Sequence, residues 1–488
     1  MNFAEILKKR ADEFPDKPAV IFHDAVVTFR QLKEISFQVA CGLAQQGLKK
    51  GDKVAIFMPN IPEYIYSFLG VFLLRGICVP LDFMLTEEEI VNFINHSESK
   101  ILIAQEKKGL NLSGLKEKCP SLKEIILIGP SWQDLLNSKI SLPEIKIEPK
   151  DYSSIFYTSG STGHPKGVML SYKHFENPVK CFDYFLHPDD KDVLICPGIP
   201  FSHLGGLDYL LLTLYFGVTL ILMERFHPLE FLKNMEKYKT TIFCIVPSMY
   251  VAILSLKEYD NFDLSSLRYA VVFGAPSSPV LLERFHKAYP NAYLLNGWGM
   301  TETAAPNSYL PTGTNTKEIA GTGKFLPGTE VKIVDGELWI KGEAVMAGYY
   351  KEPELTQEAL TEDGWLKTGD IARCDEQGRY SIVGRKKEMI KVSGEIVFAP
   401  EVEEAIQRHP KVKEIAIIGI ADELRGEVPK AFIVLKDQEK LEAEELRYFL
   451  RQHLAHFKIP HYFEFVPSLP KNRVGKIDKE ALKGRAVN

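Results

Sequence analysis

The sequence predicts a large α/β domain followed by a smaller α+β domain. Two observations predict the large domain: short apolar runs alternate with helical stretches from Pro18 to about Ala304, and 488 residues leave room for about three domains or lobes. A third observation predicts that the chain divides into two domains: the pattern changes at Val331, and a unit with its own helices and strands begins near Lys387. We therefore expect one domain at residues 1–386 and a small mobile domain at 387–488.

The strands of the large domain are expected to be parallel and buried on both faces. Each is a short apolar run, and each is followed by a helical stretch, which is the repeating unit of a parallel sheet. The clearest strand and helix pairs are residues 54–60 with 62–74, 192–198 with 207–216, 240–247 with 248–256, and 268–274 with 279–289.

One apolar segment, residues 204–223, is nearly long enough to span a bilayer, which takes about 20 residues. Asp208 and Gly217 argue against a span. Gly217 divides the segment into a helical piece and a β-branched run, which is typical of a buried helix leading into a buried strand. We expect both pieces in the core and no transmembrane segment, while peripheral membrane contact stays open.

Two further units follow the parallel sheet. Residues 331–341 alternate apolar and polar side chains around an Asp-Gly pair, which predicts a tight hairpin in a small β-rich subdomain. The last unit is expected to have its own α+β core. Its elements are a helix at 400–409, strands at 412–420 and 430–436, a helix at 443–454 and a strand at 462–466.

Charge and cysteine content exclude several classes of function. Lys and Arg number 59 against 64 Asp and Glu, for a net charge of -5, and no long basic block suits nucleic acid. The seven cysteines include no CxxC pair, which argues against a disulfide framework or a zinc site. The first residues lack the apolar core of a signal peptide. These features predict a cytoplasmic protein with a small-molecule partner and leave oligomerisation open.

The most informative stretch is residues 155–172, IFYTSGSTGHPKGVMLSY. A strand leads into a loop that offers hydroxyls, glycines and the cation of Lys166, which together suit a polyphosphate. The spacing is not that of a Walker A loop, because five residues separate Gly160 from Lys166 and no Ser or Thr follows the lysine. An ordinary Gly/Ser turn is the alternative, and the density of hydroxyls and glycines argues against it.

This loop is the first of several motifs that occur in a fixed order. They are YTSGSTGHPKG (157–167), PFSHLGG (200–206), VFGAPSS (272–278), NGWGMTETA (296–304), KTGD (367–370), GRKKEMIKVSGEIVFAPEVE (384–403) and PKNRVGK (470–476). On these motifs the chain resembles the adenylate-forming, AMP-binding superfamily, which includes acyl-CoA synthetases, firefly luciferase and carrier-loading adenylation domains. The resemblance covers nearly the whole chain.

The resemblance implies a two-step reaction that uses ATP, Mg²⁺ and coenzyme A. A carboxylate attacks the α-phosphorus of ATP to give an acyl-adenylate and pyrophosphate, and a thiol then displaces AMP. Because an anion attacks an anion, the first step calls for fixed cations, hydroxyls and Mg²⁺. The implied enzyme is an acid-thiol ligase, an AMP-forming acyl-CoA synthetase of the fatty-acid branch.

The resemblance also implies roles for single residues. Thr301 would contact the α-phosphate, Glu302 and Thr158 would bind Mg²⁺, and Asp370 would accept hydrogen bonds from the ribose beside Arg385. Trp298 stands where the family usually has tyrosine. The further contacts implied for ATP are Thr158, Ser159, Gly160, Ser161, Thr162, Gly163, Lys166, Gly274, Ala275, Pro276, Asn296, Gly297, Trp298 and Gly299.

Some of these assignments have plain structural alternatives. Thr301 and Glu302 could begin a helix with an acid near its positive end, and Asp370 could cap a turn. Lys476 lies in a basic tail, and such tails are usually solvated. Within the ordered set of motifs, the functional interpretation is favoured for all of them.

Two arrangements of the small domain are implied. In the first, the Lys476 ammonium lies across the substrate carboxylate and the α-phosphate and offsets their repulsion. In the second, the small domain has rotated about Lys387, and Lys391 and Gly394 come to the site, where glycine leaves room for the pantetheine.

The acid is expected to bind at PFSHLGG. His203 would contact its carboxylate, although a lone histidine is often simply packed. The wall of the acyl pocket would include Phe201, Gly205, Gly206 and Ala304, and PFSHLGG offers no acidic residue to pair with a substrate ammonium, which disfavours an amino acid. We expect a fatty acid of medium or long chain. The alternatives are an aryl or alicyclic acid, loading of an acyl carrier protein, a luciferase-like oxygenase and a non-catalytic membrane scaffold.

Overall fold

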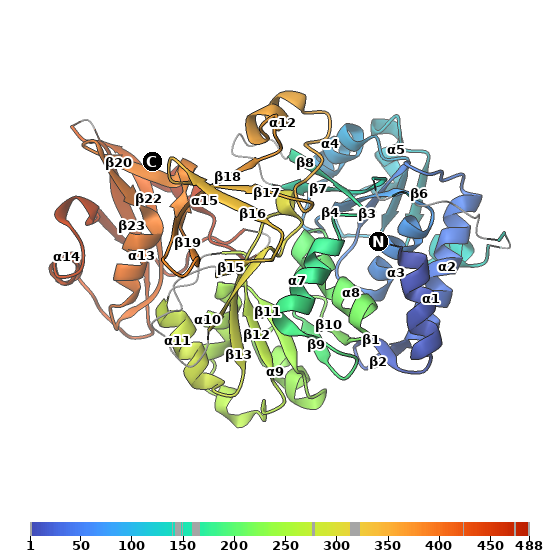
Figure 1. Cartoon of the computed structure of the whole chain (residues 1–488), viewed down its shortest axis with the longest axis horizontal. Coiled ribbons are helices and arrows are strands. Elements are labelled where there is room, and N and C mark those ends of the chain that lie inside the picture. The colour runs from blue at the N-terminus through green and yellow to red at the C-terminus, as the bar shows by residue number, and fades with distance from the viewer. Residues whose placement is uncertain are drawn as a thin grey trace.

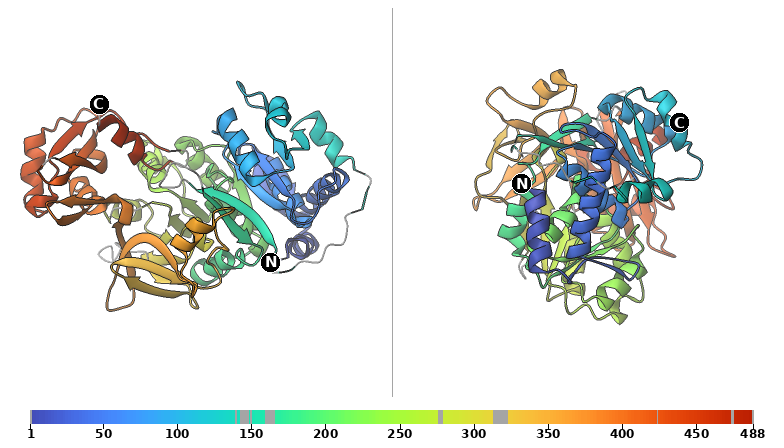
Figure 2. Two further views of the ribbon diagram at one scale, coloured as in Figure 1. Left: turned by 90° about the horizontal axis from the view of Figure 1, so that it is seen from above. Right: turned by 90° about the vertical axis from the view of Figure 1, so that its right-hand side faces the viewer.

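The computed structural model describes residues 2–138, 140–141, 148, 150–158, 166–275, 279–312, 323–422, 424–472 and 475–486. The amino-terminal elements lie at one end of the molecule and the carboxy-terminal elements at the other, with the middle of the chain between them (Figures 1 and 2). The predicted α/β large domain and the smaller domain after it are confirmed.

The first sheet of the large domain is built on parallel strands. All neighbouring strands are parallel except the last pair, which is an antiparallel hairpin. In spatial order the strands are β6 (Glu124–Leu127), β5 (Ile101–Ala104), β3 (Lys53–Phe57), β4 (Ile77–Leu81), β7 (Tyr152–Thr158) and β8 (Lys166–Ser171). The helices of this part are α2 (Phe29–Gln45), α3 (Pro62–Leu73), α4 (Glu87–Ser97), α5 (Leu115–Lys118) and α6 (Pro130–Leu136).

The second sheet has a parallel centre and antiparallel edges. Its order is β15 (Lys324–Phe325), β14 (Ser308–Thr312), β13 (Tyr293–Trp298), β12 (Tyr269–Val272), β11 (Ile242–Ile245), β9 (Val193–Cys196), β10 (Thr219–Leu222), β1 (Pro18–Phe22) and β2 (Ala25–Thr28). Its helices are α7 (Glu176–Leu186), α8 (Leu204–Phe216), α9 (Pro228–Lys237), α10 (Pro247–Leu254) and α11 (Pro279–Ala288). The first two strands of the chain thus complete an edge of a sheet whose other strands come more than a hundred residues later.

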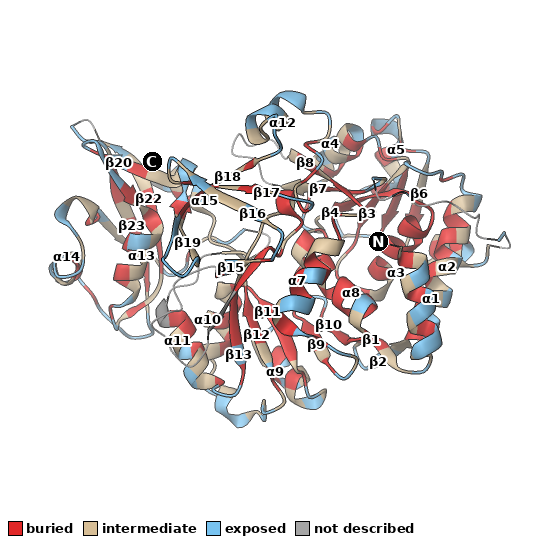
Figure 3. Cartoon of the chain, in the orientation of Figure 1, coloured by how far each residue is buried: buried red, intermediate tan, exposed pale blue. Residues whose placement is uncertain are grey.

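One continuous apolar core joins the two sheets. Helix α1 (Phe3–Glu13) contributes Phe3, whose ring contacts those of Phe72, Tyr172 and Phe175 at 4.8, 6.2 and 6.1 Å between centroids. Central strands are largely buried, while the outer helices have an exposed face (Figure 3). Aromatic contacts of this kind dominate core energetics, so the two sheets form one body.

The apolar segment at 204–223 lies in this core, as expected from its glycine. Helix α8 ends at Gly217, whose φ of +77° suits a residue without a side chain, and β10 follows directly. Among the described residues, no helix has the length and apolar character that crossing a bilayer requires.

A small antiparallel sheet follows, as the alternating pattern predicts. Its strands are β16 (Glu330–Val334), β17 (Glu337–Lys341), β18 (Leu366–Cys374) and β19 (Tyr380–Arg385), with α12 (Pro353–Ala359) before β18. Asp335 and Gly336 form the tight turn with φ of +50° and +80°. The expected Asp-Gly hairpin is therefore confirmed.

The carboxy-terminal unit has its own apolar core. Its strands are β20 (Met389–Val392), β21 (Glu395–Phe398), β22 (Val412–Asp422), β23 (Gly426–Leu435) and β24 (Tyr462–Phe465), and its helices are α13 (Ala399–Gln407), α14 (Ala443–Leu450) and α15 (Lys479–Ala486). Helix α14 is shorter than the predicted 443–454, because the N–H groups of Gln452 and His453 bond three residues back and tighten the last turn.

Candidate active site

The candidate site lies at the edge where β11, β12 and β13 end. The strands are parallel, so the segments that follow them meet at one edge of the sheet. Those segments contain Ser248, Gly274 and Thr301. The structure thus brings three regions that are far apart in the sequence to one place.

Near the end of the small domain, residues 471–472 and 475–477 are docked on this edge and are called the Lys476 loop below. The ends of this loop pair as an isolated bridge, and the Asn472 side chain accepts a hydrogen bond from the Lys476 N–H at 2.9 Å. From the large domain, the Ser248 hydroxyl donates to the Gly475 carbonyl at 2.8 Å. The small domain is therefore closed over the large one, with the loop held in place from both sides.

Lys476 extends from this loop into the site. A β-carbon on Gly274 would lie 3.5 Å from its Cε and 3.8 Å from its Nζ. Protein atoms surround the side chain, although it keeps some solvent accessibility. This burial lowers the pKa of Lys476. The positive charge of Arg385 lowers the pKa further, and the negative charge of Asp370 opposes the change. Within the described part of the chain, its ammonium forms no ion pair. A buried cation with no carboxylate of the described residues within ion-pairing distance is unfavourable, so this position suits an anionic ligand.

Asp370, Arg385 and Trp298 form a polar cluster beside Lys476. Asp370 and Arg385 are paired across β18 and β19, and their Oδ1 and Nε atoms are 2.5 Å apart. The indole N–H of Trp298 donates to the other carboxylate oxygen at 2.9 Å. Burial raises the pKa of Asp370, whose residue is only 1% exposed, while Arg385 and Trp298 oppose the rise. The tryptophan thus orients this carboxylate, a contact that its place in the motif did not reveal.

Glu302 lies in a short 3-10 turn, Thr301–Thr303, directly after β13. The Tyr349 hydroxyl donates to its Oε1 at 3.0 Å. Burial raises the pKa of Glu302, and the bond from Tyr349 and the charge of Lys166 oppose the rise. The Lys166 ammonium lies 5.1 Å from the centre of the Tyr349 ring. Thr158 on β7 is paired in register with Lys166 on β8. Carboxylate, hydroxyl and cation therefore converge on one side of the site.

The PFSHLGG motif forms the turn into α8. Phe201 is buried with its ring 5.3 Å from that of Tyr64, and His203 begins the helix with its Nδ1 3.2 Å from the Ser202 hydroxyl. Ala304 is also buried, at the end of the turn that carries Glu302.

Two pairs of glycines are explained by close packing. A β-carbon on Gly206 would lie 2.3 Å from the Pro200 carbonyl oxygen, and one on Gly205 would lie 3.0 Å from the Phe273 ring. A β-carbon on Gly297 or Gly299 would lie 2.6 Å or 2.5 Å from side-chain atoms of Tyr309 and Ala305. Any side chain there would displace backbone or ring atoms. Two other predicted ATP contacts lie at this edge. Asn296 is in the second half of β13, and Ala275 follows the end of β12.

Three predicted residues lie away from this edge. Lys387 is exposed in the short turn Lys386–Glu388 between β19 and β20. Lys391 and Gly394 are exposed on the β20–β21 hairpin, and no described atom lies within 4 Å of a β-carbon built on Gly394, whose φ is +92°. Six predicted ATP contacts lie outside the described residues: Ser159, Gly160, Ser161, Thr162, Gly163 and Pro276.

Sequence reasoning missed Tyr349, Ser248 and Asn472. Tyr349 is 47 residues from Glu302, and no spacing rule links them. Asn472 lies inside PKNRVGK, and asparagine commonly shapes turns, so this residue could have been identified from the motif.

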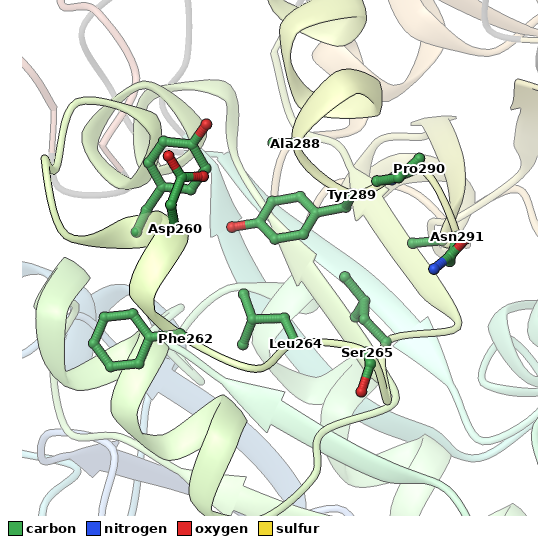
Figure 4. Close-up of a pocket in the computed structure, with 11 residues that line it drawn as sticks. Asp260, Phe262, Leu264, Ser265, Ala288, Tyr289, Pro290 and Asn291 are labelled. Atoms are coloured by element: carbon green, nitrogen blue, oxygen red, sulfur yellow. The ribbon is translucent and has the colours of Figure 1, made fainter.

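A surface hollow of about 200 Å³ lies elsewhere, near the amino ends of β12 and β13 (Figure 4). Tyr289 and Asp260 line it from two segments, together with Leu264 and Ser265. None of the predicted catalytic residues lines it. Ligands of open parallel sheets bind at the opposite, carboxyl ends of the strands, and the Lys476 edge lies at those ends.

Comparison with protein families gives two matches. Residues 7–350 match the model of the AMP-binding enzymes, and residues 401–476 match that of the AMP-binding enzyme C-terminal domain. The chain is 32% identical to the long-chain-fatty-acid–CoA ligase of Bacillus subtilis, over 98% of this chain and 93% of the relative. It is also 32% identical to the 4-coumarate–CoA ligase of Vanilla planifolia, over 97% and 91% of the two chains.

Solved structures agree with these matches. An anthranilate CoA ligase in complex with anthranoyl-AMP superposes with a TM-score of 0.92 at 27% identity, over 100% of this chain and 97% of the other. The o-succinylbenzoate CoA synthetase of Bacillus subtilis, in complex with its acyl-adenylate intermediate, gives a TM-score of 0.86 at 28% identity, over 98% and 97%.

Proposed function

Because the chain belongs to the AMP-binding enzyme family and is an AMP-forming acyl-CoA synthetase, we propose that it activates an apolar carboxylic acid, a fatty acid of medium or long chain. ATP and coenzyme A are the other substrates, and Mg²⁺ is the metal cofactor. The acid is converted to an acyl-adenylate with release of pyrophosphate, and the thiol of coenzyme A then takes the acyl group and releases AMP.

The observation that carries the proposed chemistry is the position of Lys476. Its ammonium reaches the Asp370–Arg385 cluster from the small domain; Asp370 attracts it, but no carboxylate of the described residues lies within ion-pairing distance. In the proposed first step this charge lies between the attacking carboxylate and the α-phosphate. A fixed cation there stabilises the added negative charge of the transition state without reorganisation during the reaction.

The nucleotide would lie along the same edge. Asp370 would accept hydrogen bonds from the ribose hydroxyls, with its orientation fixed by Arg385 and Trp298. Thr301 would contact the α-phosphate and Lys166 the outer phosphates, with the loop between β7 and β8. Gly274, Ala275, Asn296 and the glycines of NGWG would border the base. The arrangement of Lys166, Arg385 and Lys476 supports this placement, because all three cations face one edge.

The residues present fit Mg²⁺. Mg²⁺ in nucleotide sites is typically held by one or two carboxylates together with phosphate oxygens and waters. Glu302 is a single buried carboxylate with one oxygen oriented by Tyr349, and Thr158, which pairs with Lys166 across β7 and β8, offers a hydroxyl. These two residues would hold the ion, which would neutralise phosphate charge when bound.

The acid would enter beside α8, with its carboxylate near His203. Phe201, Gly205, Gly206 and Ala304 would form an apolar wall, which supports a hydrocarbon substrate. An aryl acid is the second candidate, since relatives named for 4-coumarate and anthranilate cover nearly the same length of chain.

The thiol step would need a different arrangement of the small domain. In the closed structure the loop of Lys476 occupies the site, whereas Lys391 and Gly394 are exposed on a hairpin. Rotation about Lys387, which lies exposed between β19 and β20, would exchange them. Gly394 would then leave space for the pantetheine arm.

A pyrophosphate-release screen tests the proposed function. Fatty, aryl and alicyclic acids are each offered with ATP and Mg²⁺, with coenzyme A, with a holo acyl carrier protein, or with neither, and products are identified by mass. We expect pyrophosphate with a fatty acid and a thioester only with coenzyme A. An aryl acid as the preferred substrate, or thioester formation only on the carrier protein, would contradict the proposal.

A further inference from the structure

Lys479 is a cation shared by two carboxylates at the start of the last helix, α15. Its ammonium lies 2.9 Å from the Oε1 atom of Glu403 and 3.4 Å from the Oε2 atom of Glu388. The lysine side chain is only 21% exposed. Burial lowers the pKa of Lys479, but the charges and hydrogen bonds of Glu403 and Glu388 outweigh burial, so the pKa is raised overall. The lysine is therefore charged at neutral pH.

The three residues come from three separate segments of the small domain, and we call them the Lys479 cluster. Lys479 lies three residues after Lys476 in the chain. Glu388 ends the short turn that contains the proposed hinge residue, Lys387. Glu403 lies in α13. The cluster thus joins the segment that carries the Lys476 ammonium to the hinge turn and to a helix of the domain core.

The Glu403 end of the cluster is fixed in the core of the small domain. Its Oε1 atom also accepts a hydrogen bond from the N–H of Ile417, on β22, at 2.9 Å. Helix α15 packs on the same sheet through Leu482, which is buried in the apolar cluster that includes Ile418. Residues three apart share a helix face, so Leu482 and Lys479 point to the same side. The apolar contact holds α15 on the sheet, and the Lys479 cluster connects it to the hinge turn.

The hinge turn and the Lys476 loop both reach the polar cluster of the site. Glu388 acts electrostatically on Asp370, whose carboxylate is paired with Arg385. Asp370 also acts on the Lys476 ammonium. Two segments of the small domain therefore approach one group of the large domain, and Lys479 links these two segments to each other.

The groups assigned to the thiol step are held by other contacts. The N–H of Ser393 donates to the Arg425 carbonyl at 2.8 Å, and the N–H of Lys391 donates to the Glu427 side chain at 3.0 Å. These bonds fix the β20–β21 hairpin to the start of β23. A shift of the Lys476 loop would therefore leave the hairpin, with Gly394, in its place.

We propose that Lys479 is a positioning residue for acyl-adenylate formation. By bonding Glu388, it fixes the Lys476 loop relative to the hinge turn, so that the ammonium reaches its place when the small domain closes. A displacement of about 1 Å at a reacting group can slow a reaction by about 10²-fold. The inference rests on the proposed function and on the proposed rotation about Lys387, and it adds a residue that contacts neither ATP nor the acid.

The two half-reaction rates of Lys479→Met test the proposal. Methionine keeps an apolar side chain of similar length and removes the charge. We expect acyl-adenylate formation to slow by about 10- to 100-fold. Conversion of supplied acyl-adenylate and coenzyme A to thioester should slow by less than about 3-fold. Because Lys476 and Gly394 both belong to the small domain, general damage to that domain would slow both steps. Equal losses in both steps, or an unchanged adenylation rate, would overturn the proposal.

Variants of the ion pair assign the effect to the link. Lys479→Arg keeps the charge and should retain most of the adenylation rate. Glu388→Gln breaks the hinge end of the link and should show the same selective loss. Combined with Lys479→Met it should add no further loss, because both changes break one link. Additive losses in the double variant, or a wild-type adenylation rate in Glu388→Gln, would contradict the proposal.

Lys430→Met is the matched control. The Lys430 side chain is 16% exposed and pairs with Glu464 at 2.8 Å, so it is a similarly shielded ion pair of the same domain. This pair joins two neighbouring strands, β23 and β24, rather than the hinge turn and α15. Both half-reactions should stay near wild type in the control. A selective loss of adenylation there would show that any ion pair of the domain has this effect, and would count against Lys479.

Folding of the variants is followed by thermal melting. Lys479→Met leaves two carboxylates together without their cation, which is destabilising. If that variant does not fold, Glu388→Gln gives the decision, because Lys479 keeps Glu403 as its partner. A wild-type enzyme that releases pyrophosphate with no acid would show that the proposed function itself has failed, a result distinct from any ratio between the two half-reactions.

Discussion

Removing the Lys476 ammonium should slow adenylation far more than thioester formation. In the closed structure its Nζ lies beside Gly274 and close to the Asp370–Arg385 cluster, where a substrate anion would meet it. Lys476→Ala removes that charge and leaves the fold of the loop to Asn472 and Ser248, which hold it through backbone atoms. The variant therefore perturbs the chemistry without removing the docking contacts.

The magnitude follows from the position of the charge. Two unit charges about 4 Å apart interact by about 4 kcal/mol at an effective dielectric constant of about 20. Partial solvent accessibility of Lys476 reduces this value, and losing one preorganised charge typically slows a reaction by about 10²- to 10³-fold. We expect a loss in that range for acyl-adenylate formation and less than about 5-fold for conversion of supplied acyl-adenylate to thioester.

Single-turnover kinetics measure the two half-reactions separately. Pyrophosphate release reports the first, and thioester formation from synthetic acyl-adenylate and coenzyme A reports the second. Lys471→Ala is the control, because Lys471 is in the same loop but pairs with Glu414 at 3.1 Å; it should leave both rates near wild type. Equal losses in both steps for Lys476→Ala would refute the reasoning.

Three further variants probe the other groups. Glu302→Ala should slow adenylation by about 10²-fold and raise the Mg²⁺ concentration needed for half-maximal rate, because a buried carboxylate is lost; an unchanged Mg²⁺ requirement in a metal titration would mean that Glu302 serves only the turn. Gly394→Leu should slow the thioester step at least about 10-fold, since a bulky residue closes the pantetheine path and is strained at positive φ, while adenylation stays near wild type; the supplied-adenylate assay checks this. Lys387→Pro should fix φ near -65° and slow at least one half-reaction, and unchanged rates in both assays would exclude a hinge at this position.

Much of the fold could be predicted because its signals are local. The Asp335–Gly336 hairpin and the break at Gly217 follow from residues within a few positions of each other. The place of β1 and β2 in the second sheet could not be predicted. β2 pairs with β1, but β1 joins the sheet through β10, which lies some two hundred residues later, and neither segment alone indicates that pairing.

The site shows the same division. Motifs indicated Asp370, Arg385 and Lys476, yet Lys476 reaches the Asp370–Arg385 pair only because the small domain is closed over the large one. The Trp298 N–H bond to Asp370 and the Tyr349 bond to Glu302 join residues 72 and 47 positions apart, so neither could be derived from spacing.

The fate of the carboxylate oxygen tests the central claim most directly. If the substrate carboxylate attacks the α-phosphorus of ATP, the bridging oxygen of the acyl-adenylate comes from the acid and leaves with AMP when the thiol adds. With an acid labelled in its carboxylate by heavy oxygen, mass spectrometry of the products of one turnover should find one labelled oxygen in AMP and none in pyrophosphate. Formation of ADP with the label in inorganic phosphate would contradict the account.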